Sequence, residues 1–307
     1  MANLTRDENQ TTYQEFYCYG GVEGIHQAFL LILNILISAA ALLGNALIIA
    51  ALPKVSSIHP SSKLLLSCLV WSDLSVGLIL EPFYITFLLS PNNTSLCYYL
   101  DIIYATTAVV FCGVSIQTIT AISVDRLLAL SLGLRYRQIV TIRRVRVFVI
   151  MSWLLSSAAS LTYLFSELIH TSITCIALFI CVAVSTFCYT KIYLILRHYQ
   201  SQVHDNIQQE PPSEGRTPVN IARYRKTVSS VLWVQVSLVA CYLPYGVATI
   251  LTTVLKMYPP SLDFVWELTY ALLMFNSSLN PILYCWKIAG MRQAVMETIR
   301  KCFHSAS

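Results

Sequence analysis

Residues Ile25 to Leu52 read IHQAFLLILNILISAAALLGNALIIAAL and contain no Lys, Arg, Asp or Glu. A helix of about 20 mostly apolar residues crosses the hydrocarbon core of a bilayer, so this stretch is long enough to be a transmembrane helix. Further apolar stretches of this length follow along the chain. The predicted spans are 25–52, 64–89, 96–130, 145–165, 169–196, 228–255 and 264–286.

The composition excludes an ordinary soluble domain. Of the 307 residues, 56% are apolar and 11% are charged, against roughly 25% charged in a typical soluble protein. No stretch shows the alternation expected of barrel strands, and helices satisfy their own backbone hydrogen bonds in lipid. We therefore predict an all-α integral membrane bundle of seven transmembrane helices, inserted in a lipid bilayer.

The basic residues predict the orientation of the bundle. The net charge is +5, but the basic residues form no single stripe, so nucleic acid is not an expected partner. All but Arg6 and Lys256 of the 20 Lys and Arg residues fall on one side of the predicted spans. That side is expected to be cytoplasmic, which places the N-terminus outside the cell. The four Asn-x-Ser/Thr triplets on the external side predict glycosylation at Asn3, Asn9, Asn92 and Asn93.

The domain organisation follows from these spans. We predict an extracellular tail over residues 1–24, the transmembrane domain over 25–286, and a cytoplasmic segment over 287–307. Within this last segment, the apolar spacing from Ile288 to Phe303 predicts a short amphipathic eighth helix on the inner membrane surface. Cys302 at its end is a candidate for palmitoylation, with an unmodified cysteine as the alternative.

Asp73 is an acidic residue in the middle of the second predicted span. Ionisable groups at membrane depth are costly and usually functional, so Asp73 needs polar partners. Candidates at similar depth are Asn45, Ser115, Asn276, Ser277 and Asn280. Such oxygen atoms suit a small hard cation such as sodium. The alternative is a protonated Asp73 in a hydrogen-bond network without an ion, and the spacing does not choose between them.

Two further features have both a structural and a functional interpretation. The pair Asp125-Arg126 ends the third span, where it is either a solvated ion pair or a switch. Pro82, Pro244 and Pro281 lie inside apolar spans, where each removes a backbone hydrogen bond and kinks its helix. Such kinks are either local packing irregularities or hinges.

Short motifs, one in most spans, carry a resemblance that covers nearly the whole chain. They are Gly44-Asn45, Ser72-Asp73-Leu74, Asp125-Arg126-Leu127, Leu134-Arg135-Tyr136, Trp153, Tyr189, Cys241-Tyr242-Leu243-Pro244 and Asn280-Pro281-Ile282-Leu283-Tyr284. In this order they resemble the rhodopsin-like (class A) G protein-coupled receptors. Two motifs depart from the usual pattern, because Leu127 and Tyr242 replace the usual Tyr and Trp.

The resemblance implies roles for these residues. Arg126 would be held by Asp125 at rest and would face the G protein in the active state. Tyr189 and Tyr284 would swing inward, Pro244 would hinge its helix, and Leu134 would dock on the G protein. Asn280 and Pro281 belong to the same activation switch, and Tyr242 would lie beneath the ligand pocket. The sodium site implied by the family would use Asp73, Asn45, Ser115, Asn276 and Asn280.

The external disulfide of the family has no counterpart here. Asp101 occupies the position of the usual cysteine, and the short loop around residues Ser166 to His170 contains none. Against this family pattern we predict that Cys18 pairs with Cys97, with two free thiols as the alternative. Cys181 replaces the usual proline of the fifth span. These departures resemble the melanocortin, adenosine, cannabinoid and lysophospholipid receptor group, although the melanocortin branch has Asp-Pro where this chain has Asn280-Pro281.

The resemblance also limits the ligand. Ala108 replaces the carboxylate with which amine receptors hold their ligands, so a monoamine is disfavoured, and Met274 replaces the retinal lysine of opsins. Glu81 and Asp101 are expected near the mouth of the pocket, where they attract a basic ligand or are merely hydrated rim residues. The predicted pocket residues are Glu81, Asp101, Ala108, Tyr242 and Met274.

We therefore predict a multi-pass receptor of the plasma membrane that couples an extracellular ligand to a heterotrimeric G protein. No grouping of nucleophile, base and acid in the sequence indicates an enzyme, and no cofactor is expected beyond the sodium ion. One alternative is a decoy or scaffold receptor that binds ligand without signalling. The other is a seven-helix transporter, which would need several ionisable groups along a path.

Overall fold

The computed structural model describes residues 24–56, 58–90, 94–209, 218–254, 260–287 and 289–306, and these residues contain helices and no strands. Side chains at some helical positions, those of Leu134 and Cys302 among them, lie outside this description. The longer helices are α2 (Ile25–Ala51), α3 (Pro60–Ser75), α4 (Glu81–Leu88), α5 (Thr94–Leu132), α7 (Ile142–Leu161), α8 (Glu167–Gln209), α9 (Pro218–Thr249), α10 (Pro260–Lys287) and α11 (Ala289–Ala306).

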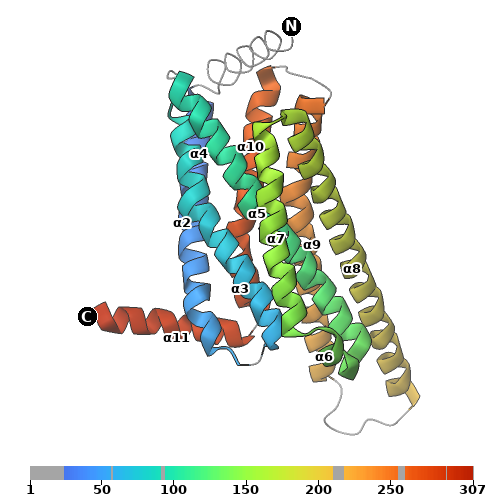
Figure 1. Cartoon of the computed structure of the whole chain (residues 1–307). Helices are drawn as coiled ribbons and strands as arrows, with labels where there is room; N and C mark the ends of the chain where they lie inside the picture. Colours follow the sequence, from blue (N-terminus) through green and yellow to red (C-terminus); the bar gives the residue numbers. More distant parts are fainter. Residues whose placement is uncertain are drawn as a thin grey trace.

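The bundle is formed by α2, by α3 and α4 together, and by α5, α7, α8, α9 and α10, as Figure 1 shows. Apart from α10, each of these spans is long and apolar enough in its described residues to cross a membrane. α10 is more polar, yet it packs between α9 and α2. Its polar residues Asn276, Ser277 and Asn280 are buried in the bundle, while Phe275 and Ile282 are exposed. The surface that α10 presents to lipid is therefore apolar, and the bundle has seven spans.

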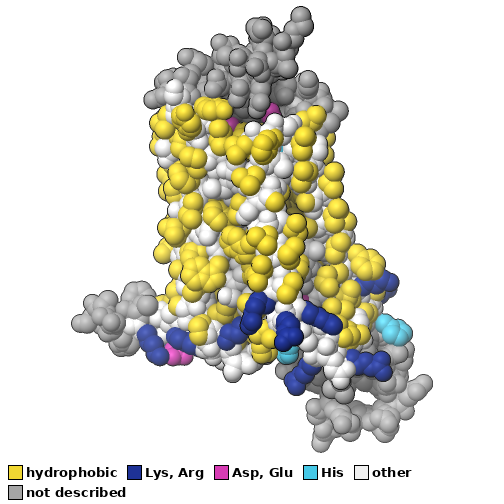
Figure 2. Space-filling model, viewed as in Figure 1, with side chains coloured by type: hydrophobic (Ala, Val, Ile, Leu, Met, Phe, Trp, Pro, Cys, Tyr) yellow, Lys and Arg dark blue, Asp and Glu magenta, His cyan; other side chains and the backbone are white. Residues whose placement is uncertain are grey.

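The distribution of polarity is that of a membrane protein. Large apolar side chains such as Leu43, Trp71 and Phe187 are more than half exposed, whereas Asp73 and Asn45 are fully buried. Figure 2 shows apolar side chains over the length of the bundle and Lys and Arg gathered at one end. Lipid solvates such a surface and water does not, so the chain is a multi-pass membrane protein.

The second span, predicted over residues 64–89 with a kink at Pro82, consists of two α-helices joined by a short turn. The turn η2 (Val76–Leu80) between α3 and α4 is a π-helix, in which the amide of Glu81 donates to the carbonyl of Val76. Pro82, which has no amide hydrogen, is the second residue of α4, after Glu81. A π turn accommodates one extra residue, and such turns are frequent at functional sites.

Close contact between helices fixes this turn against α2. A Cβ atom at Gly77 would lie 2.9 Å from the carbonyl oxygen of Ser38 and 3.0 Å from the amide nitrogen of Leu42. The hydroxyl of Ser38 also donates to the Gly77 carbonyl at 2.9 Å. Small residues allow such approaches between membrane helices, where packing provides much of the driving force.

Gly77→Val is expected to reduce the amount of folded receptor, because the new side chain meets backbone atoms that cannot rotate away. Overpacking of this kind costs about 1–3 kcal/mol. Ala39→Val, which adds bulk on an exposed position of α2, is the matched control. Fluorescence-detected gel filtration of both variants measures the monodisperse fraction, and equal yields would contradict the tight contact.

At the ends of the bundle, one prediction is wrong and another is confirmed, namely the loop before the fifth span and the helix after the last span. The connection from α7 to α8 runs through η4 (Thr162–Leu164), and α8 begins at Glu167, so His170 lies inside a helix rather than in a loop. α11 lies across the end of the bundle opposite to the label N in Figure 1. Met291 on its apolar face is fully buried against the ends of α2 and α3. Lys54 also donates to the hydroxyl of Thr298 at 2.7 Å.

Candidate functional site

Asp73 on α3 is fully buried and is held by three side chains from two other helices. The hydroxyls of Ser115 on α5 and Ser277 on α10 each donate to Oδ1 at 2.9 Å. The amide of Asn280, also on α10, donates to Oδ2 at 2.7 Å. The carboxylate therefore ties α3, α5 and α10 together at the centre of the bundle.

The other predicted sodium ligands lie differently. The Asn45 amide donates to the carbonyls of Ala41 at 2.9 Å and Ser277 at 3.1 Å, so Asn45 lies beside the site. Its Oδ1 atom is buried and has no hydrogen-bond partner among the described residues. Asn276 instead donates to the Tyr242 hydroxyl at 3.4 Å. Ser277, one of the polar candidates at this depth, is in direct contact with Asp73.

These donors fit a small hard cation. A carboxylate oxygen shared by two hydroxyls, with an unpartnered amide oxygen on the neighbouring helix, provides the oxygen ligands that such ions prefer. No group of three or more His, Cys, Asp or Glu within the described parts of the chain could hold a metal ion. The sodium site stays a prediction, with Ser277 as a more direct ligand than Asn276.

Asp125, near the C-terminal end of α5, is almost completely buried, and three groups contact it. Ser62 donates to Oδ2 at 2.8 Å, Tyr136 donates to Oδ1 at 2.5 Å, and the Arg126 guanidinium lies 3.3 Å from Oδ2. Burial, and then its bond to Asp125, raise the pKa of the Tyr136 hydroxyl, so it keeps its proton as a donor. The Arg126 side chain itself remains 43% exposed.

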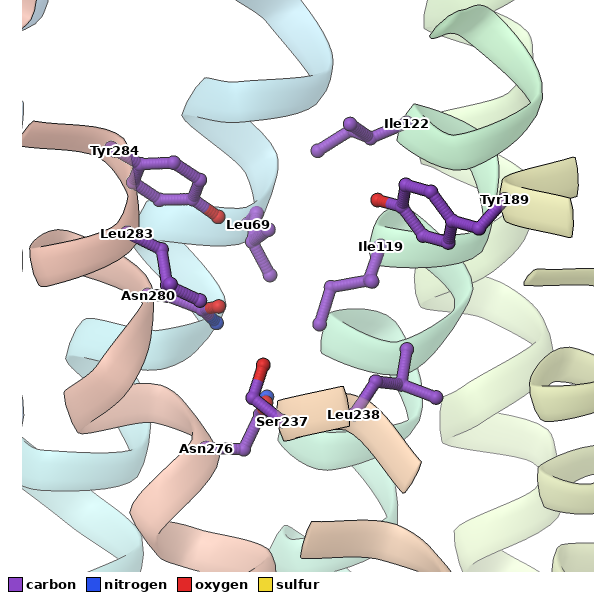
Figure 3. Close-up of a pocket in the computed structure, with 10 residues that line it drawn as sticks. All are labelled: Leu69, Ile119, Ile122, Tyr189, Ser237, Leu238, Asn276, Asn280, Leu283 and Tyr284. Carbon is purple, nitrogen blue, oxygen red and sulfur yellow. The ribbon is translucent and has the colours of Figure 1, made fainter. Parts of the chain in front are cut away.

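A cavity of about 40 Å³ separates Tyr189 on α8 from Tyr284 on α10. Figure 3 shows both hydroxyls directed toward the space between the two rings. The cavity is lined by Leu69, Ile119, Ile122, Tyr189, Ser237, Leu238, Asn276, Asn280, Leu283 and Tyr284. A water molecule needs about 10–15 Å³ of such space, so the cavity has room for a few. Asn280 borders both this cavity and Asp73, which connects the two sites.

The helices α4 and α5 contain carboxylates that are not hydrated rim residues. Glu81 is 0% exposed and Asp101 is 6% exposed, so this alternative from the sequence is wrong. Asp101 accepts a hydrogen bond from Tyr163 at 2.5 Å. Glu267 on α10 is also buried and accepts a hydrogen bond from Tyr84. Glu267 is not among the residues predicted from the sequence, although an acidic residue inside a predicted span is a recognised signal of function.

The remaining predicted pocket residues lie deeper. Ala108, Tyr242 and Met274 are all buried in the main hydrophobic cluster of the bundle. The Cys112 thiol lies 3.9 Å from the Met274 sulfur. Pro244 and Pro281 lie inside α9 and α10, at the places where the sequence predicted kinks.

Several predicted modification sites fall outside the description. Cys97 is disulfide-bonded, and seven other described cysteines are free. Cys18 lies outside the described residues, so its pairing with Cys97 stays a prediction. The glycosylation candidates Asn3, Asn9, Asn92 and Asn93 lie there too, as do the side chains of Cys302 and Leu134.

Comparison with known proteins identifies the family of this chain. The chain is similar to adenosine receptor A3 of Ovis aries, with 25% identity over 294 residues that cover 88% of this chain and 89% of that receptor. It is also similar to trace amine-associated receptor 9 of Rattus norvegicus, with 22% identity over 284 residues covering 83% and 82%. The family described as 7 transmembrane receptor (rhodopsin family) matches residues 44–172 and 165–284. These matches span most of the chain and include Asp73, Arg126 and Tyr284, so the chain belongs to the rhodopsin family of seven-transmembrane receptors.

Proposed function

We propose that this receptor lies in the plasma membrane with its N-terminus outside, and that ligand binding there activates a heterotrimeric G protein inside. The observation that supports this most is the inner end of α5. Arg126 is paired with the buried Asp125 yet partly exposed, at the end of the bundle where the basic residues gather. An exposed cation beside basic loops suits the docking of an acidic protein surface.

The proposed mechanism is a population shift between two arrangements of the bundle. The hydrogen bonds of Asp125 to Ser62 and Tyr136 hold the resting arrangement around Arg126. A ligand activates the receptor only if it binds the other arrangement more tightly. Opening of α9 at Pro244 would enlarge the cavity between Tyr189 and Tyr284 and let both hydroxyls meet through water.

A sodium ion at Asp73 would oppose this change. When bound, the ion would supply a fixed positive charge that Asp73, Ser115 and Ser277 hold from three sides. Since these residues belong to α3, α5 and α10, any motion that separates the helices would break the site. The ion would thus stabilise the resting arrangement in proportion to its affinity for it.

The names of the relatives do not choose a ligand for this chain. One relative is named for adenosine and the other for trace amines, and both are 25% identical or less. The proposal therefore specifies an extracellular ligand and a G protein without naming either.

A panel of G protein biosensors, read in cells that express the receptor, tests the proposal. We expect basal or ligand-stimulated nucleotide exchange on at least one G protein when a ligand library is applied. Binding of a ligand without any exchange would instead indicate a decoy receptor. Ion flux in liposomes that contain the purified chain would indicate a transporter, and either result would contradict the proposal.

A further inference from the structure

Glu81 is a buried acid for which the described residues supply no partner. Its side chain is 0% exposed, and neither carboxylate oxygen accepts a hydrogen bond from any described residue. The ion pairs recorded within the described ranges, Arg126 with Asp125 and Lys301 with Glu297, lie at the inner end of the molecule. A carboxylate buried without a cation or donors is costly, so its retention calls for a ligand or a second role.

The π turn aims Glu81 into the bundle. Glu81 follows Asp73 by eight residues, which in a continuous α-helix would place it about 80° around the axis from Asp73. The extra residue accommodated by η2 reduces this rotation about the helix axis by about 100°. Glu81 therefore lies within about 20° of the inward face that carries Asp73. Glu81 and Tyr84 are three residues apart on α4, so their side chains lie on the same face of that helix, and both are buried.

Aromatic rings surround the same region. The ring centre of Tyr270 lies 4.7 Å from that of Tyr84, 5.7 Å from that of Tyr104 and 5.6 Å from that of Trp266. Tyr245 lies 5.9 Å away on the remaining side. The hydroxyl of Tyr270 is buried and has no hydrogen-bond partner among the described residues. Two buried polar groups without hydrogen-bond partners among the described residues, the Glu81 carboxyl and the Tyr270 hydroxyl, therefore belong to this aromatic region.

A second acid lies on the opposite helix. Glu267 on α10 accepts the hydroxyl hydrogen of Tyr84 on α4, which joins the two helices across this aromatic region. Glu267 and Tyr270 are three residues apart on α10, so their side chains share a face of that helix, and both are buried. Carboxylates from two helices thus bear on one group of aromatic side chains.

We propose that Glu81, Glu267 and the rings of Tyr84, Tyr104 and Tyr270 form a subsite for an organic cation, such as a substituted ammonium or guanidinium group. Ring faces attract a desolvated cation, and the buried carboxylate of Glu81 supplies its counter-charge. The absence of an acid at Ala108 does not argue against such a ligand, because the charge comes from α4 and α10 instead. The inference rests on the proposed function in one respect, because it takes the subsite to be part of the site where the receptor binds its ligand.

Thermal stability of the purified full-length receptor, measured without any G protein, tests the subsite. The probes are choline and its uncharged carbon analogue 3,3-dimethylbutan-1-ol, with benzyltrimethylammonium as a larger cation, at constant chloride in potassium buffer. We expect saturable stabilisation by at least one cation and none by the alcohol. If no cation stabilises the wild type, or if the alcohol does so equally, the inference is overturned.

Substitutions then test whether Glu81 supplies the negative charge that holds the bound cation. Glu81→Gln is expected to weaken binding of the stabilising cation by about 10- to 100-fold, because it removes a charge-assisted contact. Glu167→Gln, the same change at the start of α8, is the matched control and leaves the affinity unchanged. Equal affinities of the wild type and Glu81→Gln would refute the assignment. If Glu81→Gln does not fold, Tyr270→Leu and Tyr270→Phe separate the ring from its hydroxyl, and only the Leu variant is expected to lose cation binding.

The outcome is independent of signalling. Binding of cations without nucleotide exchange in the biosensor panel would leave the subsite standing and contradict the proposed function. Exchange driven by other ligands, with no cation bound, would do the reverse.

Discussion

Arg126→Ala is expected to abolish G protein activation, and Asp125→Asn is expected to raise activation in the absence of ligand. The two residues are neighbours in sequence and form one ion pair, yet they differ in exposure, and we expect their substitutions to have opposite effects. Arg126 is 43% exposed and available to a partner, whereas Asp125 is buried and holds Arg126 in place. Loss of Arg126 removes the group that contacts the G protein, whereas loss of the Asp125 charge releases Arg126 from its ion pair.

The size of the second effect follows from the contacts of Asp125. An asparagine keeps one oxygen for Ser62 or Tyr136 but loses the charge that attracts Arg126. Removal of the charge from the buried partner of such a pair shifts the equilibrium by about 1–2 kcal/mol, which corresponds to roughly 5- to 30-fold in the active population. Basal nucleotide exchange, normalised to surface expression, measures this shift.

A surface ion pair of the same chain provides the control. Glu297 and Lys301 on α11 lie 2.8 Å apart, four residues from one another, and both are well exposed. Exposed pairs contribute little, so Glu297→Gln is expected to leave basal exchange unchanged. If Asp125→Asn behaved like Glu297→Gln, the Asp125 pair would be a solvated helix end without a switching function.

Asp73→Asn is expected to eliminate sodium-dependent stabilisation of the receptor. In the wild type, replacement of KCl by NaCl at equal ionic strength should raise the unfolding temperature by a few degrees, since saturation of a site contributes about 1–3 kcal/mol. In the variant the oxygen still accepts from Ser115 and Ser277, but the charge that holds the cation is gone. Differential scanning fluorimetry of both proteins in the two salts measures the difference.

The sequence prediction and the structure differ in the role of Asn276 at the predicted sodium site. The family resemblance assigns Asn276 to the sodium ligands, but its amide is directed to the Tyr242 hydroxyl. Asn276→Ala should therefore retain the effect of sodium, while Ser277→Ala should reduce it. The opposite pair of results would return Asn276 to the site, and a wild type insensitive to sodium would indicate a network without an ion.

The sequence by itself determined the class of this protein. Spans such as 25–52 are recognisable because a helix that crosses lipid needs an uninterrupted apolar stretch of sufficient length. Such a stretch can be read from the sequence without knowledge of how the helices pack. Asp73, Asp125-Arg126 and Asn280-Pro281 stood out for the same reason, as ionisable groups and prolines where lipid disfavours them. The presence of an amphipathic helix after the last span was likewise visible in its apolar spacing, and α11 is that helix.

Only the tertiary structure decided which polar groups meet. Ser277 and Asn276 are adjacent in sequence and equally polar, and the rotation of α10 alone directs one to Asp73 and the other to Tyr242. Glu81 could not be placed on the inward face from its spacing, because the π turn before Pro82 shifts the phase of every residue that follows. That shift depends on the packing of Gly77 against α2, a contact between segments far apart in sequence that no local pattern encodes.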